Sequence, residues 1–160
     1  MSSDRIEKQV VLKAPLERVW RAISDADEFG RWFGVRFDGP FVEGAALTGV
    51  MTPTAVDEEI AKSQEAYAGI AETWWIVAVE PPRRLAYRWH PYPVEDDDAP
   101  TTLVEFTLQE TADGVLLRIV ESGFDAIPAD RRASAFDDNS TGWATQTELV
   151  RRYVMMREAV

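Results

Sequence analysis

The segment Val120-Glu121-Ser122-Gly123-Phe124, followed by Pro128 and then by Asn139-Ser140-Thr141-Gly142-Trp143, decides how this chain folds. It joins the end of an alternating apolar strand to a long helix that carries a tryptophan near its start. A glycine turn with a phenylalanine behind it, a short linker and a Gly-Trp helix start form a specific connection. The segment therefore predicts a strand followed by a long C-terminal helix that packs back onto a sheet.

The C-terminal region is predicted to contain two helices. Residues 128–136 favour a short helix, and Asp138, Asn139 or Ser140 can cap a longer one over 141–157. One stripe of the longer helix is apolar and should face the sheet, at Trp143, Thr147, Val150 and Val154.

The remaining sequence predicts one strand, two short helices and then further strands. The first helix follows Pro15, and Asp25 with Glu28 three residues later is typical of a capped start for the second. Residues 53–69 are polar and read as a long hairpin insertion with a helical turn over 56–64. Period-two alternation predicts strands over 6–13, 34–41, 45–52, 70–79, 85–90, 102–108 and 115–122. The expected fold class is α+β, with a curved antiparallel sheet of about six to seven strands wrapped around the C-terminal helix.

Composition limits the classes of partner. The 160 residues suffice for one domain over 1–160, and they carry 28 acidic against 17 basic side chains, a net charge of −11. This charge argues against binding to nucleic acid or to an anionic membrane surface. The chain has no cysteine, and its polar N-terminus predicts no signal peptide, so the expected location is cytoplasmic.

Several segments resemble the START-like helix-grip superfamily (SRPBCC-type domains). They are the opening Ala14–Ile23 with Arg31-Trp32-Phe33, the strands over 82–89 and 102–108, and the Glu121–Phe124 and Gly142-Trp143 connection. The similarity covers roughly Ile6 to Tyr153. It looks closest to the bacterial branch similar to the activator of heat-shock protein 90 ATPase. The resemblance implies a cavity between sheet and helix, and activities that range over hydrophobic ligand binding, polyketide cyclisation, co-chaperone action and stress response.

Glu121 is the sharpest candidate for chemistry, because strand register places it inward with Leu117 and Ile119. It either anchors a polar group of a ligand or acts as an acid, or it binds a backbone amide or an arginine at the helix junction. His90, the one histidine, can lie toward the same end of the sheet as Glu121, although alternation predicts that it is exposed on the opposite face from Trp89.

The aromatic side chains, with three polar groups among them, are candidates for the wall of a ligand cavity. No pattern typical of a metal site, a catalytic triad or a phosphate-binding loop is present, so we expect no metal and no cofactor. The candidate ligand-binding residues are Trp32, Phe33, Glu72, Trp74, Tyr87, Trp89, Phe106, Glu121, Phe124, Phe136 and Trp143.

Three functions follow from these observations. The first is non-enzymatic binding of a small hydrophobic or aromatic molecule between sheet and helix. The second is a protein-interaction or co-chaperone-like module acting on a chaperone ATPase, and a homodimer also stays open. The third is a cyclase- or hydrolase-type enzyme that uses Glu121.

Overall fold

The computed structural model describes residues 4–96 and 98–156, and its elements follow the expected order. The strands are β1 (Arg5–Leu12), β2 (Val35–Phe37), β3 (Ala46–Met51), β4 (Ala71–Glu80), β5 (Arg84–Trp89), β6 (Thr102–Thr111) and β7 (Gly114–Ser122). The α-helices are α1 (Leu16–Ser24), α2 (Ala26–Phe33), α3 (Glu58–Gln64) and α4 (Ala129–Met155). Two short 3-10 turns, η1 (Glu65–Tyr67) and η2 (Phe124–Ala126), complete this part of the chain.

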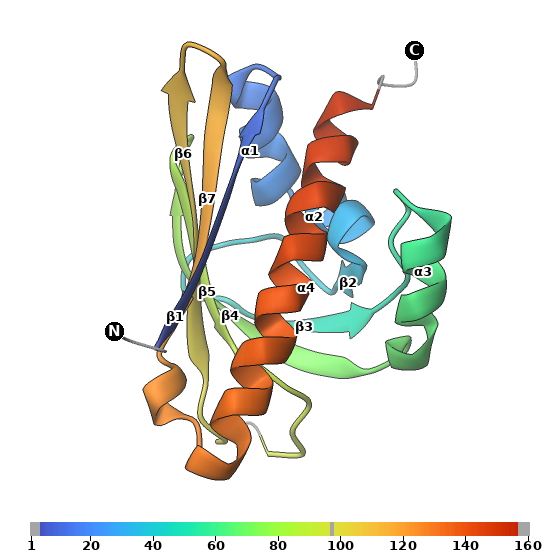
Figure 1. Cartoon of the computed structure of the whole chain (residues 1–160), viewed down its shortest axis with the longest axis vertical. Helices are drawn as coiled ribbons and strands as arrows, with labels where there is room; N and C mark the ends of the chain where they lie inside the picture. The colour runs from blue at the N-terminus through green and yellow to red at the C-terminus, as the bar shows by residue number, and fades with distance from the viewer. Residues whose placement is uncertain (1–3, 97, 157–160) are drawn as a thin grey trace.

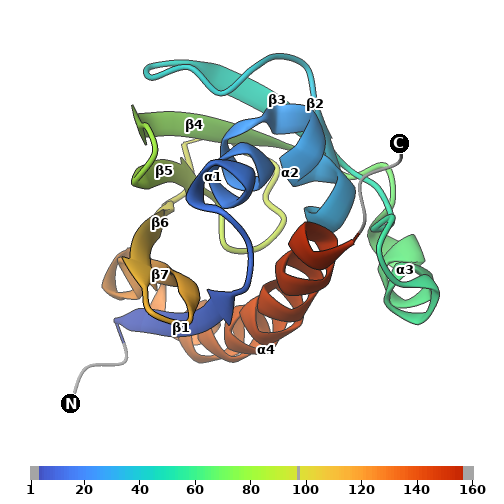
Figure 2. The same cartoon turned by 90° about the horizontal axis from the view of Figure 1, so that it is seen from above.

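The seven strands form one antiparallel sheet in the order β1-β7-β6-β5-β4-β3-β2. The sheet bends around α4, which crosses its concave side, while α1 and α2 lie near one end (Figures 1 and 2). A register shift between Ile76 and Ala78 interrupts the pairing of β4 with β5, and such bulges increase local twist. The α+β helix-grip architecture predicted from the sequence is confirmed.

Local signals explain the pair of short helices. Asp25 caps α2, because its Oδ1 accepts a hydrogen bond from the backbone N–H of Glu28 at 3.0 Å. Gly34 ends α2 with φ of 93°, where a side chain would also meet the Thr52 carbonyl oxygen at 2.6 Å. The indole Nε1 of Trp32 donates to the Ala22 carbonyl at 2.9 Å and so fixes α2 against α1.

Two predicted boundaries are wrong. The strand expected over 34–41 is reduced to Val35–Phe37, because Asp38 turns back to accept the Thr48 N–H and Pro40 has no N–H to donate. The C-terminal region is one continuous helix from Ala129 to Met155, so no new helix starts near Thr141. Asn139, expected as a cap, instead points its amide toward Glu121 inside the fold.

Aromatic side chains fill much of the space between sheet and helices. Phe29 of α2 lies at the centre of this cluster and is fully buried. Trp74 can pack tightly there because Gly49 on β3 has no side chain; a Cβ at this position would lie 2.7 Å from the Trp74 indole nitrogen. The ring centroids of seven aromatic residues lie within 6.4 Å of that of Phe29: Trp32, Phe33, Phe37, Phe41, Trp74, Tyr87 and Phe106.

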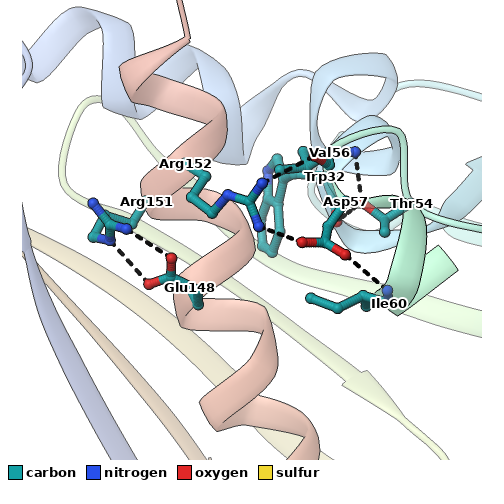
Figure 3. Close-up of polar contacts among 8 residues, drawn as sticks. All are labelled: Trp32, Thr54, Val56, Asp57, Ile60, Glu148, Arg151 and Arg152. Atoms are coloured by element: carbon teal, nitrogen blue, oxygen red, sulfur yellow. Dashed lines mark hydrogen bonds and ion pairs between the residues drawn. The ribbon is translucent and has the colours of Figure 1, made fainter. Parts of the chain in front are cut away.

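The insertion over 53–69 is tied to the C-terminal half of α4. Arg152 donates to the Asp57 carboxylate at 2.5 Å, and Asp57 in turn caps α3 by accepting the Ile60 N–H at 2.9 Å (Figure 3). The Arg152 guanidinium and the backbone hydrogen bond to Ile60 both lower the pKa of Asp57, the hydrogen bond more strongly. Thr54 joins the start of the insertion to α2 through its hydroxyl, which donates to the Trp32 carbonyl at 2.9 Å. These bonds attach the insertion to α2 and to α4 beside the sheet.

Candidate functional site

Glu121 lies at the centre of a buried hydrogen-bond network between the sheet and α4. Its register on β7, opposite Ile6 of β1 and Val104 of β6, turns its side chain inward as predicted, and it is 0% exposed. Four neutral side chains donate to its two oxygens. They are Trp89 Nε1 at 2.8 Å, Thr102 Oγ1 at 2.6 Å, Trp143 Nε1 at 2.8 Å and Asn139 Nδ2 at 3.0 and 3.2 Å.

This network uses both oxygens of Glu121. The two indole N–H groups and the Asn139 amide can only donate to it, and the Thr102 hydroxyl lies within hydrogen-bond distance as a fourth partner. The lone pairs of Glu121, about four sites on two oxygens, are already occupied. In this arrangement Glu121 joins β5, β6 and β7 to α4 through side chains. Of the roles considered for Glu121, this geometry is nearest to the one in which it binds other groups of the protein. The partners are side chains, however, and not the backbone amides or the arginine that were expected.

A pocket opens beside this network at the rim of the sheet, and we call it the rim pocket. One side of the pocket is formed by residues of β3, the insertion and β4: Met51, Tyr67, Ile70, Glu72 and Trp74. The other side is formed by the end of β5, the loop after it and α4: Trp89, His90, Pro91–Pro93 and Asn139. Its volume is about 180 Å³. Most of the wall is apolar or aromatic, and Glu72 adds a carboxylate, which is the composition expected of a small-molecule site.

A smaller pocket of about 80 Å³ lies next to the rim pocket and shares Trp89 and Asn139 with it. Phe33, Gly142, Trp143 and Gln146 complete its wall. The Nε2 of Gln146 donates to the Phe33 carbonyl at 3.0 Å, which fixes the orientation of its amide. Both pockets lie along the line where α4 meets the sheet.

The predicted ligand-binding residues fall into three groups. Glu72, Trp74 and Trp89 line the rim pocket, and Phe33, Trp89 and Trp143 line the smaller one. Glu121 stands behind Trp89 and Asn139. The third group lines neither pocket: Trp32, Tyr87 and Phe106 are fully buried in the aromatic core, and Phe124 packs on Phe136 with ring centroids 5.2 Å apart.

His90 is not exposed, contrary to the expectation from strand alternation. It is 5% exposed, its Nδ1 lies 3.3 Å from the Pro100 carbonyl oxygen, and its ring stands edge-on to Trp75 at 5.4 Å. β5 ends at Trp89, so His90 begins a loop and the alternation of the strand does not extend to it. The loop over 90–93 folds it in as part of the pocket wall.

A wider groove of about 470 Å³ lies between residues 24–27 and 37–41. It carries three aspartates, which could attract a cation. However, Asp25 and Asp38 already accept hydrogen bonds from the backbone amides of Glu28 and Thr48. These carboxylates hold the backbone in place, so we do not take the groove as the site. Within residues 4–96 and 98–156, no three His, Asp or Glu side chains gather closely enough to hold a metal ion.

Tyr87 provides a test of how the core treats polar groups. Its hydroxyl is buried, and within the described part of the chain it neither donates nor accepts a hydrogen bond. Burial raises the pKa of Tyr87 well above its ordinary value of 10.0, and the negative charge of Glu121 raises it further. We expect Tyr87→Phe to leave stability unchanged or to raise it by about 1 kcal/mol, because no hydrogen bond is lost and a desolvated hydroxyl is removed.

The same substitution should alter the response to alkali. In the wild type the unfolded tyrosine ionises near pH 10 while the folded one keeps its proton, so stability falls as pH rises above that value. Tyr87→Phe should make this fall shallower. Urea unfolding at neutral pH and above pH 10 measures both effects, and a loss above about 1 kcal/mol at neutral pH would reveal a partner for the hydroxyl.

Several wall residues were missed by sequence reasoning. Tyr67 lies near the end of the insertion, Ile70 begins the predicted strand over 70–79, and Pro91–Pro93 follow a strand. No periodic pattern marks Tyr67 or Pro91–Pro93, and only the Pro-Tyr-Pro run, which is typical of a rigid loop, could have indicated a preformed wall. Asn139 and Thr102 were also missed as partners of Glu121, because their roles depend on contacts between distant segments.

The curved sheet that grips a long helix, with pockets where the two meet, defines this chain as a helix-grip protein of the START-like class. Residues 13–154 match the family described as Activator of Hsp90 ATPase homolog 1-like protein. The chain belongs to this family. A search of curated proteins finds no match. No helix in the described residues is both long and apolar enough to cross a membrane.

Solved structures share the fold at low sequence identity. A protein of Mesorhizobium loti is 20% identical with a TM-score of 0.71, over 97% of this chain and 99% of that one. A protein of Mycobacterium smegmatis is 15% identical with a TM-score of 0.70, over 99% and 93%. DynU16, from the dynemicin biosynthetic locus, is 22% identical with a TM-score of 0.68; 96% of this chain aligns, which spans about half (48%) of DynU16. At these identities the likeness concerns the fold alone.

Proposed function

We propose that residues 1–160 act as one ligand-binding domain that holds a small, largely apolar molecule in the rim pocket. The observation that supports this is the pocket itself, which has a volume of about 180 Å³ and is lined by aromatic, proline and aliphatic side chains with one carboxylate. A cavity of about 150 Å³ with apolar walls binds benzene in another protein. A molecule with a single ring therefore matches the available space.

The size of the pocket narrows the ligand. Sites for drug-sized molecules enclose about 300–1,000 Å³, and the rim pocket is smaller than that. The reason lies in the core, where Phe29 and its aromatic neighbours occupy the volume that a deep cavity would need. Long acyl chains and polycyclic molecules are accordingly disfavoured as ligands for this conformation.

Binding can be tested by titrating the ¹⁵N-labelled protein with benzyl alcohol and following the NMR signals. The indole N–H signals of Trp74 and Trp89 should shift in a saturable way, because both side chains line the pocket. Native mass spectrometry of the purified protein should in parallel show whether a ligand is retained. Saturable shifts confined to residues far from the rim pocket would contradict the proposal.

A pair of variants sharpens this test. Ile70→Trp places a large ring in the wall of the pocket and should abolish the shifts while circular dichroism shows a folded protein. Val11→Trp makes the same kind of change on β1, where the side chain is 40% exposed and outside the pocket, and binding should persist. Retained binding in Ile70→Trp would place the ligand elsewhere.

A co-chaperone-like interaction is the second candidate, and the family to which the chain belongs is the observation that favours it. The exposed large apolar residues do not add to this support, since they come from separate segments: Val11, Val42, Tyr67, Val77 and the pair Met155 and Met156. Stimulation of the ATPase of an Hsp90-type chaperone by the purified protein would establish this function. The enzyme that uses Glu121 has the weakest support, because four protein donors occupy the carboxylate.

A further inference from the structure

We propose that the rim pocket selects organic cations: an ammonium group carried on an apolar body about one ring in size. This inference rests on the proposed binding function and specifies the ligand class. It follows from the sign of the charges around the pocket and from the aromatic character of its wall.

The lining of the rim pocket carries an acidic group. Glu72 contributes a carboxylate to the wall, and none of the described residues that line the pocket is a lysine or an arginine, although Arg131 of α4 lies on the ring of Tyr92. An anionic ligand would therefore meet a carboxylate without a basic side chain in the wall to bind it. Like charges at short distance repel one another, whereas an ammonium group would be attracted.

Glu121 adds to this negative potential from behind the wall. It is fully buried, and the four groups that donate to it are neutral, so these hydrogen bonds bring no opposite charge to its carboxylate. Two of these donors, Trp89 and Asn139, also line the rim pocket. The field of a buried carboxylate is weakly screened by solvent, and it reaches the pocket across these two side chains.

The aromatic side chains of the pocket wall also favour a cationic ligand. Trp74 and Trp89 lie with ring centroids 4.9 Å apart, and Tyr67 and Tyr92 line the pocket with them. The face of an aromatic ring is negative because of its quadrupole, and it attracts ammonium groups, tryptophan most strongly. Cages of aromatic rings are the recurrent surroundings of bound quaternary ammonium groups.

One cation already rests on this wall and helps to place the ligand. The Arg131 guanidinium of α4 lies 4.1 Å from the centroid of the Tyr92 ring. It occupies that ring and would repel a second cation beside it. The favourable position for an ammonium group is therefore on the side of Glu72, Trp74 and Trp89.

Three ligands of nearly equal shape separate charge from size: benzylamine, benzyl alcohol and benzoate. They are positive, neutral and negative at neutral pH. In ¹⁵N NMR titrations, benzylamine should bind at least about tenfold more tightly than benzyl alcohol, the effect of a hydrogen bond to a charged group. Benzoate should bind most weakly of the three.

The carboxylate can then be tested directly. Glu72→Gln keeps the shape of the side chain and should reduce the affinity for benzylamine about tenfold while the affinity for benzyl alcohol stays the same. Glu110→Gln is the matched control, because Glu110 is exposed and lies near the β6–β7 hairpin, at the end of β6 opposite to Thr102. It should change neither affinity.

The outcomes distinguish the two proposals. If benzyl alcohol or benzoate binds as tightly as benzylamine, or if Glu72→Gln leaves the preference intact, charge selection is overturned while the binding function stands. If none of the three ligands produces saturable shifts, the binding function fails and the cation preference fails with it.

Discussion

Trp143→Ala should lower the free energy of unfolding by about 3–5 kcal/mol, the range for removing a buried aromatic side chain from a core. Trp143 is 2% exposed and packs against Trp89, Phe106 and Phe33, with ring centroids 5.7–6.0 Å away. Its indole also donates to Glu121. The substitution therefore opens a cavity and leaves one oxygen of a buried carboxylate with fewer donors.

Urea unfolding followed by circular dichroism measures this loss. Trp143→Phe separates the two contributions, because it keeps most of the ring and removes the indole N–H; it should cost about 1–3 kcal/mol, the range for a buried hydrogen bond to a charged group. A loss below about 1 kcal/mol for Trp143→Ala would show that α4 does not depend on this contact for docking.

The fold was predictable because it rests on local periodicity. Alternation of apolar residues marks strands, and spacing of three and four marks helices, so the order of elements and the antiparallel hairpins follow from neighbouring residues. The inward register of Glu121 follows in the same way from Leu117 and Ile119, two and four residues before it. These features require no knowledge of distant contacts.

The continuous helix α4 shows where such local reasoning fails. Asp138, Asn139 and Gly142 are typical of a helix boundary, and they suggested a break before Thr141. In the fold, the Asn139 amide is engaged by Glu121, and a side chain at Gly142 would meet no atom within 4 Å. The packing of α4 against the sheet outweighs the weak preference of these residues for a helix end. For glycine, the cost of lying inside a helix is about 1 kcal/mol relative to alanine.

The pocket could not be predicted because its volume depends on how side chains fill a curved sheet. Phe29 lies on the second short helix, and its position at the centre of seven rings fills space that a deeper cavity would need. Tyr67 and Tyr92 reach the wall from an insertion and a loop, neither of which has a periodic pattern. The sequence therefore identified Glu72, Trp74 and Trp89 as candidate ligand-binding residues, but it could not predict the shape of the pocket that they line.

Glu121→Gln tests whether the buried carboxylate serves the fold. We expect a loss of about 2–4 kcal/mol in the free energy of unfolding. A glutamine keeps one acceptor oxygen but points an NH₂ group at the donors of the other, so the N–H of either Trp89 or Trp143 is left without an acceptor, and each unsatisfied buried donor costs about 1–3 kcal/mol. The Thr102 hydroxyl can rotate and accept a hydrogen bond from the new NH₂ group, which reduces the loss of stability if that group faces Thr102.

The control for this experiment is Glu105→Gln on the neighbouring strand β6. Glu105 pairs with Arg84 at 2.8 Å, and about a third of each side chain is exposed, so removing its charge should cost no more than about 1 kcal/mol. Urea unfolding of both variants measures the difference, and benzylamine titration of each shows whether binding is affected. If Glu121→Gln also loses the binding of neutral benzyl alcohol while its stability stays within about 1 kcal/mol of the wild type, then the carboxylate contacts the ligand, and the four donors are partners that the ligand replaces.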